Sequence, residues 1–184
     1  MKTTFVHIPK TAGTSIKSSI DLHCNYTFPY GHDPYFILQQ NNDLSDSYTF
    51  TVVRNPFTRT VSYYLHFCIQ NQIDDTSFED FLYLLKEGYS TRNTPMMPYP
   101  QSFYVHDLDG NIPENLKIFR FERLKELEKT LKIKLNKLNS SNYSRGFYHS
   151  CYTPKNIERV CELFSCDFIN FNYSFDFTYE QTRI

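Results

Sequence analysis

The sequence predicts an α/β fold, with one domain over residues 1–184, a central parallel sheet flanked by helices, and a P-loop-like loop after the first strand. Segments with strand patterns alternate along the chain with segments of helical pattern, which is typical of parallel sheets covered by helices. The 184 residues suffice for one sizeable core. Hydrophobic residues make up 40% of the chain and aromatic residues 17%, which is a globular and not a disordered composition.

Three short segments have the composition and alternation of core strands. They are Thr3–Ile8, Tyr48–Arg54 and Leu116–Phe121. The first begins almost at the start of the chain. A polar, proline-bearing stretch, residues 23–47, separates the first two and has no clear pattern.

Five segments have helical spacing of their apolar residues. They are Thr14–Leu22, Pro56 to about Gln70, Ser77–Glu87, Arg123 to about Leu135, and Thr153 to about Cys166. Ser77 and Asp80 resemble a capping box, and Gly88 stands where a helix stops. Thr153 is expected to cap the last helix, with Pro154 at its first position. Residues 89–100 and 136–150 are predicted to be loops.

Charge and cysteine usage argue against several classes of protein. With 19 basic and 20 acidic residues, the chain lacks the basic excess of a general nucleic-acid binder. No segment approaches the ~20 apolar residues of a membrane span, and the N-terminus lacks the apolar region of a signal peptide. The five cysteines form no CxxC pair, so we expect reduced thiols, no metal site and a cytoplasmic protein.

The first segment that carries chemistry runs from Phe5 to Ser15, with the sequence FVHIPKTAGTS. A strand leads through a loop with one lysine and one glycine into a helix rich in hydroxyl groups, which suits an anion. Gly13 allows close approach of the backbone, Lys10 supplies a positive charge, and the hydroxyls cap the helix or donate to a ligand. An ordinary strand-to-helix turn is the alternative. A Walker A loop is disfavoured, because its lysine follows the second glycine.

The second segment surrounds Arg54, which ends the second strand, and Ser62, which lies about two turns into the next helix. Ligands of parallel sheets bind beyond the carboxyl ends of the strands, so we expect Arg54 and the Lys10 loop at one edge. A P-loop kinase would typically place a metal-holding Asp at such a strand end. An arginine there favours a second anionic group. Arg59 is either a ligand contact or a structural ion pair.

Together, these segments resemble the sulfotransferase superfamily, and most closely its carbohydrate-type branch with the heparan sulfate 2-O-sulfotransferases. Lys10 to Ser15 is similar to the family's 5′-phosphosulfate loop, and Arg54 with Ser62 is similar to its 3′-phosphate motif. Residues 119–124 (FRFERL) and 167–173 (DFINFNY) resemble later family segments. The resemblance covers nearly the whole chain.

The resemblance implies the donor 3′-phosphoadenosine 5′-phosphosulfate (PAPS), the product 3′-phosphoadenosine 5′-phosphate (PAP), and no metal. Arg54 and Ser62 are expected to hold the 3′-phosphate, and Arg145, in a polar loop, is expected to close over the nucleotide. The residues expected to hold the 5′-phosphate and the sulfonate are Lys10, Thr11, Ala12, Gly13, Thr14 and Ser15.

Transfer to a hydroxyl also needs a base, and His is the usual choice near neutral pH. His32 lies between the two motifs, where the 2-O-type enzymes carry their catalytic His, whereas His7 is expected to be a packed core residue. Asp33 and Glu79 are the rival carboxylate bases. We expect His32 to deprotonate the acceptor and Lys10 to stabilise the leaving group.

The implied acceptor is a hydroxyl of a carbohydrate or similar molecule. Residues 117–137 hold eight basic and three acidic residues, which either steer an anionic polysaccharide or form a solvated helix face. An aromatic group either stacks on sugars or is core; it comprises Tyr63, Tyr64, Tyr99, Phe103 and Tyr104. The competing functions are a small-molecule kinase with a variant phosphate loop and a non-catalytic nucleotide-binding protein. Because the loop begins within ten residues of Met1, we expect no membrane anchor.

Overall fold

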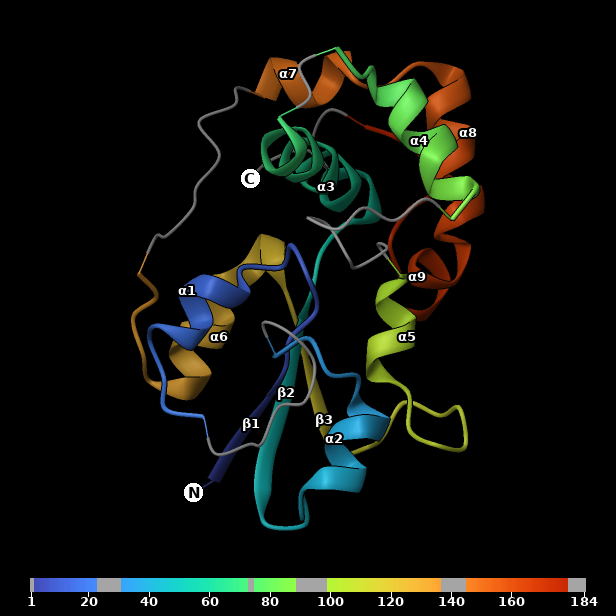
Figure 1. Ribbon diagram of the computed structural model, residues 1–184. Coiled ribbons are helices and arrows are strands. Elements are labelled where there is room, and N and C mark those ends of the chain that lie inside the picture. Colours follow the sequence, from blue (N-terminus) through green and yellow to red (C-terminus); the bar gives the residue numbers. More distant parts are fainter. Residues whose placement is uncertain (1, 23–30, 73–74, 89–98, 137–144, 179–184) are drawn as a thin grey trace. The chain divides into compact units, whose positions relative to one another are not determined.

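A computed structural model describes residues 2–22, 31–72, 75–88, 99–136 and 145–178 (Figure 1). The chain forms two compact units, and each is described by itself. The first unit combines Met1–Arg54 with Gln101–Ser141, and the second combines Asn55–Pro100 with Asn142–Ile184. The single domain over residues 1–184 stays a prediction.

The first unit is built on a parallel three-stranded sheet, as predicted. Its strands are β1 (Lys2–Val6), β2 (Ser47–Val53) and β3 (Leu116–Arg120), in the order β1-β2-β3. Both pairs are parallel, with Phe5 beside Phe50 and Val53 beside Arg120. The carboxyl ends of all three strands therefore meet at one edge, where a parallel sheet places its ligands.

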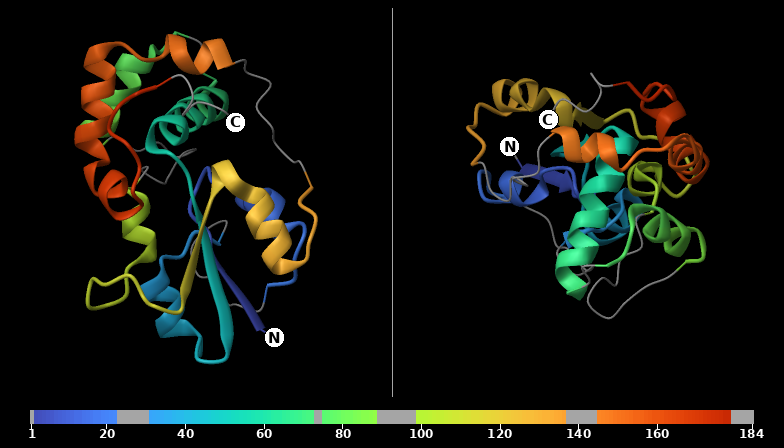
Figure 2. Two further views of the ribbon diagram at one scale, coloured as in Figure 1. Left: turned by 180° about the vertical axis from the view of Figure 1, so that it is seen from behind. Right: turned by 90° about the horizontal axis from the view of Figure 1, so that it is seen from above.

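Helices cover both faces of this sheet, which confirms the predicted fold class. Figures 1 and 2 show α1 (Gly13–Lys17) and α6 (Leu124–Leu131) on one side, and α2 (Tyr35–Asn41) and α5 (Gln101–Val105) on the other. On the first side, Ile16 and Leu127 pack on buried strand residues. These strand residues are Phe5, Phe50, Val52 and Phe119.

Two helices of this unit are shorter than predicted. The predicted helix Thr14–Leu22 is α1, which ends at Lys17. The hydroxyls of Ser18 and Ser19 both donate to the Ser15 carbonyl, so these side chains compete with the backbone donors that would extend the helix.

The predicted helix from Arg123 to about Leu135 is likewise shorter at its end. It begins with a 3-10 turn, η2 (Phe121–Arg123), and continues as α6 to Leu131. Lys132 adopts a left-handed conformation that ends it. The apolar pattern continues past the helix because Leu135 packs against the same cluster from the following segment.

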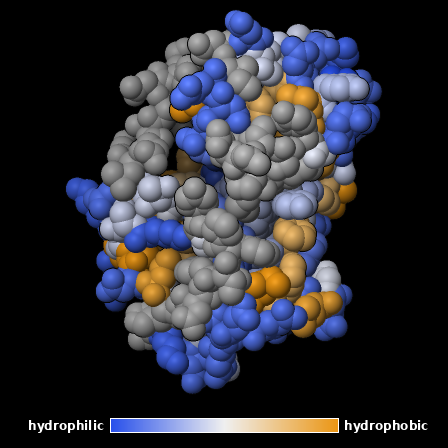
Figure 3. All heavy atoms as spheres, in the orientation of Figure 1, coloured by the Kyte–Doolittle hydropathy of each residue, from blue (hydrophilic) through white to orange (hydrophobic). Residues whose placement is uncertain are grey.

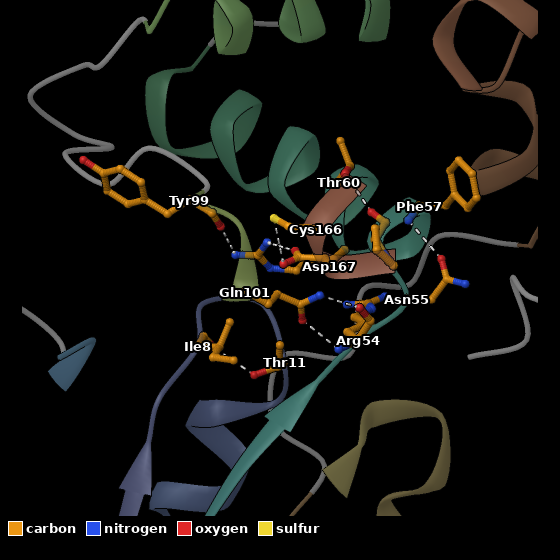
Figure 4. Close-up of polar contacts among 12 residues, drawn as sticks. Ile8, Thr11, Arg54, Asn55, Phe57, Thr60, Tyr99, Gln101, Cys166 and Asp167 are labelled. Carbon is orange, nitrogen blue, oxygen red and sulfur yellow. Dashed lines mark hydrogen bonds and ion pairs between the residues drawn. The ribbon is translucent and has the colours of Figure 1, made fainter. Parts of the chain in front are cut away.

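The second unit is helical. Its helices are α3 (Pro56–Asn71), α4 (Phe78–Lys86), α7 (Arg145–Ser150), α8 (Pro154–Leu163) and α9 (Ser165–Asn170). The predicted caps are confirmed: the Ser77 hydroxyl accepts from the Asp80 N–H, and the Thr153 hydroxyl accepts from the Asn156 N–H. Asn55 likewise accepts from the Phe57 N–H at the start of α3 (Figure 4).

Two predictions in this unit were wrong. Residues 145–150 were expected to be loop and form α7. The helix expected from Thr153 to about Cys166 is interrupted at Phe164, whose φ of −123° lies outside the helical range. The Phe164 side chain is buried in the core, so the helix is interrupted at a residue that packs inside the unit.

Aromatic side chains dominate the core of this unit, including Phe57, Phe81 and Phe168. Tyr63 is buried among them, and the Tyr64 hydroxyl donates to the Thr76 carbonyl. These two tyrosines therefore belong to the core, which is the second of the two roles that the sequence allowed for the aromatic group.

Hydrophilic residues cover much of the face in Figure 3, and the hydrophobic residues on it form separate patches. Within the part of the chain that the structure describes, no helix has the length and apolar character needed to span a bilayer.

Candidate functional site

The loop after β1 leads into α1 and has an unusual backbone. Lys10 and Ala12 have φ values of 68° and 70°, in the left-handed region that L-residues rarely adopt. Residues held this way cost of order 1–3 kcal/mol each and cluster at functional sites. The Thr11 hydroxyl donates to the Ile8 carbonyl at 2.7 Å and thereby closes the loop on itself (Figure 4).

Lys10 lies in this loop with much of its side chain buried. Loss of water contacts and the nearby positive charge of Arg54 lower the pKa of Lys10 from 10.5 to about 8. Both causes act against the charged form, and an anion beside the two cations would counter the second of them. The loop therefore has the electrostatic character of an anion site.

Arg54 follows β2 and reaches the same loop, as predicted. Its Nη1 donates to the Lys10 carbonyl at 3.2 Å. Its guanidinium also lies over the ring of Phe121, 4.3 Å from the centroid, directly after β3. Arg54 is only 4% exposed. The ends of the three strands thus bring two cations and an aromatic ring together.

Gln101, at the start of α5, was not identified from the sequence. Its side-chain Oε1 accepts from the Arg54 N–H, and its Nε2 donates to the Arg54 carbonyl, both at 2.8 Å (Figure 4). Gln101 is completely buried. No sequence motif reveals it, because its partners are backbone groups 47 positions away.

Two histidines of the first unit, His7 and His32, lie together. His32 Nδ1 is 2.9 Å from the His7 carbonyl oxygen, and the two rings are 4.0 Å apart between centroids. His7 is buried, which confirms that it is a packed residue, whereas His32 is half-buried. Gly31 precedes His32 with φ of 66°, a conformation that glycine adopts without strain.

The remaining loop residues differ in exposure. Thr14 is exposed, Ala12 is half-buried, and Gly13 and Ser15 are buried. The expected cap by a threonine or serine hydroxyl is wrong: Ala12 is the N-cap residue, and it makes no side-chain cap bond. The reason is the left-handed backbone at Ala12, which sets the start of α1 without a hydroxyl.

Three other predicted residues belong to the second unit. Ser62 is half-buried on α3, and Arg145 begins α7, although its side chain lies outside the described residues. Glu79, the rival base on α4, pairs with Lys155 at the surface. Asp33, the other rival, is in the first unit and is completely buried.

Arg59 on α3 is a structural residue. Its Nη2 donates to the Tyr99 carbonyl at 3.0 Å, and its Nη1 lies 3.9 Å from Asp167 Oδ2 (Figure 4). Arg59 is 2% exposed and Asp167 is 0% exposed. Arg59 therefore takes the second of the two roles that the sequence allowed for it, that of a structural ion pair.

Comparison with known proteins connects these observations to a family. The model of the sulfotransferase family matches residues 2–174, which include both strand-end motifs and most of the second unit. A search of curated proteins finds no match to the chain. Because the family model covers nearly the whole sequence, the chain belongs to the sulfotransferase family.

Proposed function

We propose that this protein transfers a sulfuryl group from PAPS to a hydroxyl of a carbohydrate-like acceptor. Membership of the sulfotransferase family supports sulfuryl transfer in general. The observation that carries the proposal is the proximity of Lys10 and Arg54: the Arg54 guanidinium donates a hydrogen bond to the backbone carbonyl of Lys10. Two adjacent cations suit a donor that carries phosphate groups at its 3′ and 5′ positions.

The residues fit this donor. The loop from Lys10 to Ser15, called the donor loop below, also contains Thr11, Ala12, Gly13 and Thr14 and would hold the 5′-phosphate and the sulfonate. Arg54 would hold the 3′-phosphate, and a charge-assisted bond of this kind is worth about 1.5–3 kcal/mol. Ser62 and Arg145 stay predictions that rest on the sequence resemblance alone.

His32 is the base that the geometry favours. It is half-buried and lies near the end of β1, beside the donor loop. Glu79 belongs to the other unit, and its carboxylate pairs with Lys155. Asp33 is inaccessible to solvent in the described structure. An imidazole also has the pKa range that suits a base near neutral pH.

The proposed chemistry is a single displacement. His32 accepts the proton of the acceptor hydroxyl as a bond forms from that oxygen to sulfur. The bond from sulfur to the bridging oxygen of the 5′-phosphate breaks at the same time, and PAP leaves. Lys10 stabilises the charge that develops on this oxygen, and loop N–H groups stabilise the sulfonate.

The carbohydrate acceptor is supported by the sequence resemblance to the 2-O-sulfotransferase branch. The near-neutral net charge of −1 favours a weakly charged acceptor over a heavily sulfated one. The basic residues after β3 do not form a uniform positive surface, since Arg123 pairs with Glu126 across one helical turn.

Thermal unfolding with candidate nucleotides tests the donor. PAP at 100 times its dissociation constant should stabilise the protein by about 2.7 kcal/mol, whereas ATP with Mg²⁺ should not. Stabilisation by ATP with Mg²⁺ and none by PAP would contradict the proposed sulfuryl transfer and favour a small-molecule kinase. PAP binding without transfer to any acceptor would favour a non-catalytic nucleotide-binding protein.

Substitution of His32 tests the base. His32→Ala should lower transfer of ³⁵S-labelled sulfate from PAPS to unsulfated polysaccharides by about 10²–10⁴-fold, while PAP affinity stays within twofold. His106→Ala, outside the donor loop, is the matched control and should retain activity. Full turnover by His32→Ala would transfer the role to a carboxylate, and Asp33→Asn would then be the next variant.

A further inference from the structure

We infer that His7 is a positioning residue that fixes the ring of His32, and that Gly13 is a glycine because the His7 ring occupies the space of its side chain. The inference rests on the proposed function in taking His32 as the base. It adds a mechanical connection between that base and the donor loop. All of the residues that carry it belong to the first unit.

The hydrogen bond from His32 determines which of its nitrogens is basic. Its Nδ1 lies 2.9 Å from the His7 carbonyl oxygen. A carbonyl oxygen only accepts, so Nδ1 must carry the proton. In the neutral ring, Nε2 is then the nitrogen with the lone pair, and this is the atom that would take the acceptor's proton.

The ring of His7 connects His32 to the core of the sheet. It lies 4.0 Å from the His32 ring and 5.3 Å from the Phe5 ring, and Phe5 lies 4.9 Å from Phe50. Phe5 and His7 share a face because they are two residues apart in extended chain. Since Phe5 and Phe50 are completely buried in adjacent strands, this column of four rings has a rigid base.

Gly13 lies against the Nε2 end of the His7 ring. A Cβ atom at Gly13 would lie 1.6 Å from His7 Nε2 and 2.0 Å from Cδ2, far inside van der Waals contact. Gly13 is absent from the glycines with positive φ, so the backbone does not demand glycine here. Space for the His7 ring is therefore the physical reason for this glycine.

The proposed base and the donor loop therefore both pack against the same side chain, the ring of His7. Gly13 starts α1, and His7 immediately follows β1, so the ring between them ties the loop to the strand. A reacting group must be held to within about 0.5 Å for efficient transfer. The His7 ring supplies this constraint for His32 through stacking, and its carbonyl supplies it through the hydrogen bond.

Nitrogen-15 NMR of the histidine side chains tests the inference without any donor or acceptor. In the wild-type protein, His32 should be the tautomer with the proton on Nδ1, assigned by the loss of its signals in His32→Ala. His7→Ala keeps the backbone carbonyl but removes the ring that stacks on His32, so the His32 ring is held less firmly against its acceptor. The population of the Nε2–H tautomer, which dominates for free imidazole side chains, should therefore rise. His106→Ala is the control and should leave the His32 signals unchanged.

A double-mutant cycle tests the contact itself. Gly13→Ala should reduce thermal stability strongly in the wild-type background and much less in His7→Ala, where the added methyl group has room. Equal losses in both backgrounds would overturn the packing argument. An Nε2–H tautomer in the wild type, or an unchanged tautomer in His7→Ala, would overturn the positioning role.

The tautomer of His32 and the binding of PAP can be measured independently of each other. Absence of PAP binding would defeat the proposed donor and leave the tautomer result in force. If PAP binds and transfer is detected, His7→Ala should lower kcat by at least about tenfold while PAP affinity changes by less than twofold. An unchanged kcat in a folded His7→Ala protein would overturn the positioning role.

Discussion

The side-chain amide of Gln101 holds the backbone of Arg54 through both of its polar groups, with two hydrogen bonds of 2.8 Å. The arrangement satisfies the N–H and the carbonyl of Arg54, the residue that directly follows β2. A rotation at Arg54 would break both bonds at once. The amide therefore sets the direction in which the guanidinium leaves the sheet, toward Lys10 and Phe121.

Gln101→Leu should destabilise the protein, because it leaves two buried backbone groups without these partners, at about 1–3 kcal/mol for each group. Chemical denaturation measures this loss, and calorimetry should show weakened PAP binding. Gln40→Leu, at an exposed position on α2, is the matched control and should change stability by less than about 0.5 kcal/mol. Equal effects of the two substitutions would refute the role of Gln101.

Arg54→Gln should weaken PAP binding about 10- to 150-fold, the loss expected for one charge-assisted contact of about 1.5–3 kcal/mol. Adenosine 5′-monophosphate lacks the 3′-phosphate, so its affinity should change by less than about threefold if Arg54 serves that phosphate. Titration calorimetry with both nucleotides separates the two cases. Arg123→Gln, at an exposed site, should leave both affinities unchanged. Equal losses for both nucleotides would place Arg54 elsewhere in the site.

The affinity for PAP should depend on pH through Lys10. Its pKa of about 8 means that the side chain is charged below pH 8 and loses its proton above it. A bound anion favours the charged form, so binding above pH 8 requires uptake of a proton. PAP affinity should be constant from about pH 7 to 8 and then fall by up to tenfold per pH unit. The phosphates contribute little there, since their second pKa is about 6.

Lys10→Arg should remove this pH dependence, because arginine stays charged throughout the range. Lys125→Met, at an exposed position on α6, should leave it unchanged. The stability of the free protein should change in the opposite sense. Between pH 8 and 10.5, the unfolded chain keeps a proton on Lys10 that the native protein has lost, so Lys10 makes the free energy of unfolding rise with pH. A flat PAP affinity up to pH 9.5 would contradict the assignment.

Asp167→Ala should destabilise the second unit by about 3–5 kcal/mol, because it leaves the buried charge of Arg59 without its carboxylate. Glu126→Ala offers a matched comparison, since its partner Arg123 is 65% exposed and such surface pairs contribute at most about 1 kcal/mol. Urea denaturation of both variants gives the comparison. Similar losses would mean that the Arg59 pair adds nothing beyond a surface contact.

The sequence by itself determined the strands, most of the long helices and the position of the two motifs. These features depend on local patterns: alternation in β2, helical spacing in α3, and the caps at Ser77 and Thr153. The meeting of Lys10 and Arg54 was also predictable, because parallel strands place their carboxyl ends at one edge.

Tertiary structure alone decided which side chains support the site. Gln101, His7 and Gly13 act through contacts with groups distant in the chain or facing across a loop, and no periodicity records such contacts. The short α2 lacks enough turns for a helical pattern. Gly13 shows the difference most clearly: its position was visible in the sequence, but its physical reason, the space taken by the His7 ring, exists only in the folded chain.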